Sequence, residues 1–120
     1  MTKQHPKAAV PTKEDLLKYF TISSGYRIVA TVNAYRQRYG KWPVKVSMDT
    51  GMFEALPRDI FTPLGWEMMA SKLTLAANDK GTVIAEGDDG TSFDYEDVEE
   101  HQPPIGERAD EWIWGIKLVG

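Results

Sequence analysis

The sequence of 120 residues contains no cysteine, which excludes disulfides, thiolate metal ligands and a cysteine nucleophile. It also lacks any apolar run near the roughly 18 residues of a membrane span. No apolar segment typical of a signal peptide follows the first residues. These absences lead us to expect a cytoplasmic protein that makes no contact with a membrane.

The length and composition favour one globular domain. Hydrophobic residues make up 42% and charged residues 27% of the chain, values typical of a folded protein. Residues 1–11 contain two prolines and little apolar mass, so we expect a flexible tail there. The remaining residues, 12–120, are then a single α+β domain.

Helical spacing is clearest in the first half of the chain. Thr12 begins a capping-box pattern that predicts a short helix. A second helix is predicted from Ser23 or Ser24 to Gly40, with one apolar stripe: Ile28, Val32, Tyr35 and Tyr39. Two shorter helices are predicted after Asp49-Thr50, stopped by Pro57, and from Thr62-Pro63 to Lys72.

Alternation of apolar and polar residues predicts the strands. The segments 73–76, 82–85 and 92–95 are joined by Asn/Asp- and Gly-containing turns and predict a three-stranded antiparallel meander over 73–95. Strands 44–48 and 112–119 complete a small, mainly antiparallel sheet on which the N-terminal helices pack. Residues 96–109 are expected to form an acidic surface loop.

The net charge of −4 conceals a sharp division. Residues 1–48 hold nine Lys/Arg and two Asp/Glu, whereas residues 49–120 hold five Lys/Arg and sixteen Asp/Glu. The most acidic stretch, 86–111, has eleven carboxylates and one arginine. Two interpretations follow: the halves lie side by side and partly neutralise each other, or a charged surface binds a partner.

The second interpretation predicts a small non-enzymatic protein-interaction module: an adaptor, small subunit or inhibitor whose acidic surface binds another protein, for example a basic one. The apolar C-terminal strand, with Ile113 on its outer face, predicts self-association or a partner that covers it. The candidate partner-binding residues are Asp88, Asp89, Asp94, Glu96, Asp97, Glu99, Glu100 and Ile113.

A nucleic-acid-binding domain is the alternative. Residues 26–45 combine basic and aromatic side chains, as single-strand binders do. The candidate residues are Arg27, Arg36, Arg38 and Lys41. Helical spacing places Arg27 and Arg38 on one flank of the apolar stripe and Arg36 on the other, and the whole chain is acidic, so this alternative is less favoured.

One three-residue string suggests an enzyme. Asp49-Thr50-Gly51 follows a predicted strand and resembles the signature of aspartic proteases, which implies a catalytic aspartate pair across a dimer axis. The following Met52 to Leu56 is helical in pattern and departs from that family. We therefore expect Asp49 or Thr50 to cap a helix.

No other motif indicates catalysis, a metal or a cofactor. The two histidines, His5 and His101, have no partner at a suitable spacing. The turn Gly87-Asp88-Asp89-Gly90 does not match the register of a calcium-binding EF-hand loop, and it predicts a solvated hairpin turn. We expect no catalytic residues, no metal and no cofactor.

Overall fold

The helix α2 (Ser23–Tyr39) is the central element of the protein. The computed structural model describes residues 12, 14, 23–59, 62–98 and 109–116. Eight consecutive α2 residues, 28–35, are buried. The predicted apolar stripe faces the sheet, and the helix ends as expected at Gly40, which has φ +74° and donates its N–H to the Arg36 carbonyl.

Four strands form one mixed sheet with the order β2-β1-β3-β4. Its strands are β1 (Lys45–Asp49), β2 (Thr74–Asn78), β3 (Ile84–Glu86) and β4 (Ser92–Asp94). β1 pairs with β2 in parallel and with β3 antiparallel, and β3 pairs antiparallel with β4. The α+β class, with helices packed on a small and mainly antiparallel sheet, is confirmed.

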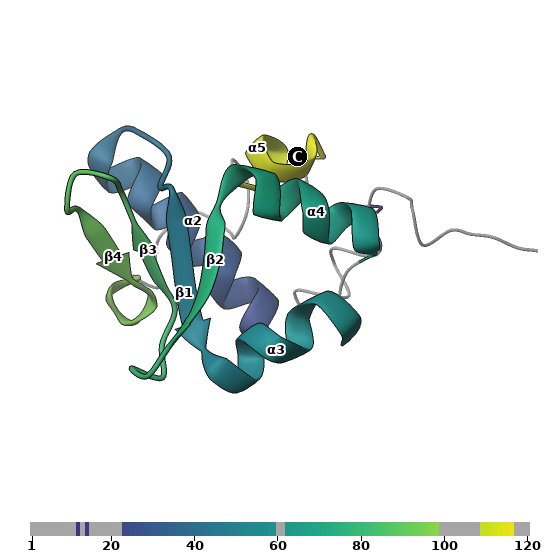
Figure 1. The fold of residues 1–120 in the computed structure, drawn as a ribbon. Coiled ribbons are helices and arrows are strands. Elements are labelled where there is room, and N and C mark those ends of the chain that lie inside the picture. Colours follow the sequence, from purple (N-terminus) through teal and green to yellow (C-terminus); the bar gives the residue numbers. More distant parts are fainter. Residues whose placement is uncertain (1–11, 13, 15–22, 60–61, 99–108, 117–120) are drawn as a thin grey trace, which may run out of the picture.

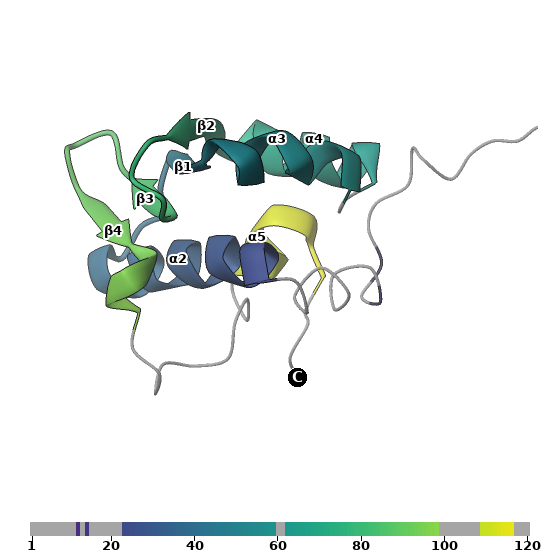
Figure 2. The ribbon, with the colours of Figure 1, turned by 90° about the horizontal axis from the view of Figure 1, so that it is seen from below.

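Helices cover only one face of this sheet in the described part of the chain. α2 lies behind the strands in Figure 1 and below them in Figure 2. α3 (Thr50–Asp59) and α4 (Pro63–Lys72) lie beside the strands, and α5 (Ala109–Trp114) packs between α2 and α4. The other sheet face, toward the viewer in Figure 1, is open.

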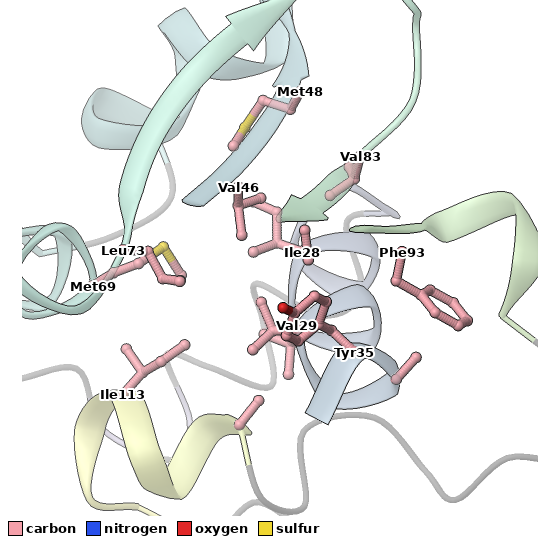
Figure 3. Packing of buried hydrophobic residues seen from close by; sticks show 14 of the residues in the cluster. Ile28, Val29, Tyr35, Val46, Met48, Met69, Leu73, Val83, Phe93 and Ile113 are labelled. Carbon is pink, nitrogen blue, oxygen red and sulfur yellow. The ribbon is translucent and has the colours of Figure 1, made fainter. Parts of the chain in front are cut away.

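The core fills the space between the sheet, α2 and α5 (Figure 3). Val46 and Met48 of β1 point into it together with Ala85 of β3 and Phe93 of β4. Pairing in register places these side chains on one face of the sheet. α4 adds the buried Met69.

Three predicted features differ from the structure. The meander is wrong because β1 lies between β2 and β3, so only β3 and β4 form a hairpin. α3 runs through Pro57 to Asp59 instead of stopping at the proline. The predicted helix after Thr12 and the tail at 1–11 lie almost wholly outside the described residues.

The third difference is the C-terminal strand, because residues 109–114 form the helix α5. Ala109 and Ile113, and likewise Asp110 and Trp114, are buried pairs one turn apart. Gly115 ends the helix with φ +75° and donates its N–H to the Glu111 carbonyl. Ile113 is 1% exposed, so its predicted place on an outer surface is wrong, and strand-mediated self-association loses its basis.

Candidate functional site

The hairpin between β3 and β4 presents the first part of the acidic surface. Gly87 donates its N–H to the Thr91 carbonyl at 2.9 Å and closes the loop. The Asp89 carboxylate accepts from Thr91 Oγ1 at 2.6 Å and from Thr91 N at 3.3 Å. Asp88 points outward, with its side chain 82% exposed. The solvated hairpin turn predicted here is confirmed.

Lys41, just beyond α2, joins the basic half of the chain to this acidic loop. Its Nζ lies 2.5 Å from Asp89 Oδ2 and 4.0 Å from Asp88 Oδ1. The hydrogen bond from Lys41 holds the pKa of the Asp89 carboxyl well below its usual range, with further help from Thr91. The same bond raises the pKa of Lys41. At this point the two charged halves meet and partly neutralise each other.

Acidic side chains also follow the other end of β4. The 3-10 turn η2 (Tyr95–Asp97) comes directly after the strand, and its Glu96 and Asp97 are exposed. Asp94 has a structural role, because its Oδ1 accepts from Glu96 N at 2.9 Å and from Thr82 Oγ1 at 2.8 Å. Glu99 and Glu100 lie outside the described residues. Asp88, Glu96 and Asp97 therefore bracket β4.

The arginines predicted to contact nucleic acid lie on two flanks of α2, as expected. Arg27 stands over the Tyr95 ring at 5.5 Å from its centroid, and Arg38 stands over Phe93 at 5.8 Å. Arg36 lies on the other flank, over the Trp42 ring at 5.1 Å. Each guanidinium has an aromatic partner within the same chain.

Two tryptophans form a stack on that second flank. The Trp42 and Trp112 rings are parallel within 1°, with centroids 4.3 Å apart. Arg36 covers the outer face of Trp42, and Lys72 of α4 lies 5.6 Å from the Trp112 centroid. The stack ties α5 to α2 and α4. Because cations cover the outer faces, these rings offer little surface for stacking on a base.

The open sheet face carries a hollow that sequence reasoning missed. Its volume is about 380 Å³, and the loops before and after β3 border it. The lining includes Lys45, Ser47, Asn78, Lys80, Ile84 and Glu86. Alternation along β1 could have placed Lys45 and Ser47 on the face opposite Val46. It could not have shown which loops border them.

Asp49 lies where β1 passes into α3. Its Oδ2 accepts the Gly51 N–H at 3.1 Å, a capping contact at the beginning of the helix. The sequence led us to expect this capping role for Asp49 rather than the role of a catalytic aspartate in a protease. Among the described residues, no three histidine or carboxylate side chains come together as a metal site, and no helix is long and apolar enough to span a bilayer.

Comparison with known proteins adds no relative: no family model, no curated protein and no solved structure matches this chain.

Proposed function

We propose that this protein is a non-enzymatic interaction module that presents an acidic surface to a basic protein partner. The observation that carries the proposal is the placement of Asp88, Glu96 and Asp97 around β4. All three side chains are exposed. Among the described residues, the one cation within ion-pair distance of any of them is Lys41, whose Nζ lies 4.0 Å from Asp88 Oδ1.

These carboxylates are suited to attracting a basic partner rather than to stabilising the fold. Exposed charges contribute little to stability when they are not closely paired. The same charges steer an oppositely charged partner and raise its association rate, an effect that salt screens. The neighbouring Asp89 and Asp94 are held by internal hydrogen bonds and support the loop geometry.

Nucleic acid is not part of the proposal. Each candidate cation already has a partner in the chain: an aromatic ring for each arginine and Asp89 for Lys41. The acidic surface lies next to Arg27 and Lys41 and repels a polyanion. A basic protein meets neither obstacle.

Two charge-matched variants test the proposal. The acidic-surface variant carries Asp88→Asn, Glu96→Gln and Asp97→Asn. The control variant carries Glu54→Gln, Glu67→Gln and Asp79→Asn, which are exposed positions elsewhere on the protein. Each variant removes three negative charges, so a difference between them reports the position of the charges and not the net charge.

The readout is affinity capture from native lysate at low and high salt, followed by titration of the identified partner. We expect wild type and control to retain a basic partner, and the acidic-surface variant and high salt to release it. Equal retention by both variants, or an acidic partner indifferent to salt, would overturn the proposal. Recovery of RNA or DNA would favour the alternative function.

A further inference from the structure

The hollow on the open sheet face has the dimensions of a small-molecule site. Its volume of about 380 Å³ falls within the roughly 300–1,000 Å³ usual for ligand pockets. In the described part of the chain, no helix covers this face of the sheet (Figures 1 and 2). A ligand can therefore enter from solvent without any movement of α2 or α5.

A fixed hydrogen-bond donor lies within this hollow. Ser47 lines it and is only 5% exposed. Its Oγ accepts a hydrogen bond from Asn78 Nδ2 at 2.8 Å, and Asn78 is itself held by the Thr82 carbonyl and by Lys80 N. Among the described residues, no acceptor takes the Ser47 hydroxyl proton. Ser47 is thus preorganised to donate to an oxygen of a ligand.

The cations lining the hollow form no ion pair within the described residues. Lys45 and Lys80 line it, and no carboxylate of the described residues lies within ion-pair distance of either. Lys41, outside the hollow, differs because Asp89 neutralises it. Glu86 is the one carboxylate among the lining residues, which leaves a net positive charge.

An apolar surface completes the lining. Ile84 of β3, half-buried on the open face, is the one large apolar side chain among the lining residues. We propose that this hollow binds a small organic oxyanion, a carboxylate or a phosphate ester, through Ser47, Lys45 and Lys80, with its apolar part against Ile84. A charged acceptor uses two cations and one oriented hydroxyl better than a neutral molecule does.

The proposal is independent of the acidic-surface function, because none of Asp88, Glu96 and Asp97 lines the hollow and the ligand has the opposite charge to a basic partner. The probes are benzoate, phenyl phosphate and, as a neutral control, benzyl alcohol, each titrated into the full chain at low ionic strength. Amide NMR shifts locate the binding. We expect saturable changes in β1, β3 and the loop containing Lys80 for one or both anions, and none for benzyl alcohol.

Single substitutions distinguish a site from general charge attraction. Lys45→Met and Lys80→Met should each weaken anion binding by about tenfold, since each removes a charged hydrogen bond. Lys72→Met removes the same charge from α4, outside the hollow, and should leave affinity unchanged. Glu86→Gln should tighten binding several-fold, because it removes the only lining carboxylate.

The relative affinities of benzoate and phenyl phosphate identify which oxyanion the hollow prefers. Equal weakening by Lys72→Met and Lys45→Met would reduce the effect to net charge and overturn the proposal. So would shifts confined to α2, or saturable binding of benzyl alcohol at the same place. Circular dichroism of every variant confirms that each is folded.

Discussion

Replacing Gly87 by alanine should destabilise the protein, because the side chains packed around it leave no room for a β-carbon. A Cβ on Gly87 would overlap the Tyr35 hydroxyl and lie 2.6 Å from Thr91 Oγ1 and 2.9 Å from Asp89 Oδ1. Tyr35 is completely buried in α2, so its ring cannot swing away. Its hydroxyl also forms a hydrogen bond with Thr91, which any displacement would break.

The expected loss combines two costs. Forcing extra volume into a packed site costs about 1–3 kcal/mol. A buried hydroxyl left without its partner costs about 1–3 kcal/mol more. The free energy of unfolding should therefore fall by about 2–6 kcal/mol. This is a large part of the roughly 5–15 kcal/mol typical of a domain.

Urea denaturation followed by circular dichroism measures this loss. Gly51→Ala is the matched control, because Gly51 lies in α3 and its nearest neighbour to an added Cβ is Asp49 Oδ2 at 3.3 Å. Alanine is a better helix residue than glycine by about 0.5–1 kcal/mol. The control should thus be neutral or slightly stabilised.

The variant Tyr35→Phe tests the cause of the loss. It removes the oxygen that the Gly87→Ala methyl would overlap, so the double variant should lose less stability than the sum of the two single variants. A Gly87→Ala protein within about 0.5 kcal/mol of wild type would refute the reasoning. Strict additivity with Tyr35→Phe would refute the assigned partner.

Three further outcomes are expected. Ile113→Lys should unfold the domain or cost several kcal/mol, because the side chain is 1% exposed, and a stable, folded variant by circular dichroism would contradict the helical placement. The stack of Trp42 on Trp112 contributes about 0.5–1.5 kcal/mol beyond the area it buries, so Trp112→Leu should lower the free energy of unfolding by at least that much in urea denaturation, and an unchanged value would contradict the stack. Because the Lys41 hydrogen bond lowers the pKa of Asp89, Lys41→Met should raise that pKa toward about 3.9, measured by carboxyl NMR. Any stability that the pair adds is present at neutral pH and lost as the pH falls below this value, so wild type and Lys41→Met should converge in acid.

Local signals in the sequence were sufficient to predict the elements whose ends depend on interactions between residues close together in the chain. The stripe of α2 and its end at Gly40 were predicted, as was Thr62 as the cap of α4, where its Oγ1 accepts the Gly65 N–H at 3.0 Å. The hairpin at 87–91 was predicted for the same reason. In each case the interaction joins residues a few positions apart.

Strand neighbours were not predictable in this way. The turn residues before Gly81, which has φ +73°, correctly indicated that the chain reverses direction between β2 and β3. They carry no information about which strand lies alongside, and β1 occupies the place between them. Turn chemistry specifies a reversal, whereas pairing depends on packing over the whole sheet.

The C-terminal error has a different cause. Trp112, Ile113 and Trp114 are all apolar, so a period of two and a helical period fit this short run equally well. The deciding signals were Gly115 as a helix-ending residue and Ala109 one turn before Ile113. The open-face hollow had no sequence signal because loops distant from β1 in the chain complete it.

The central place of β1 in the sheet has a consequence for the order of folding. Neither neighbour of β1 is adjacent to it in the chain, since α3 and α4 precede β2, and β2 in turn precedes β3. Only the β3–β4 hairpin can form by closing a short loop. Both strand pairings of β1 require the ordering of a much longer segment, which is entropically costly and slows folding. A ribosome-bound chain that ends before β3 lacks one whole side of its sheet, so β1 exposes an unpaired edge until synthesis has passed Glu86.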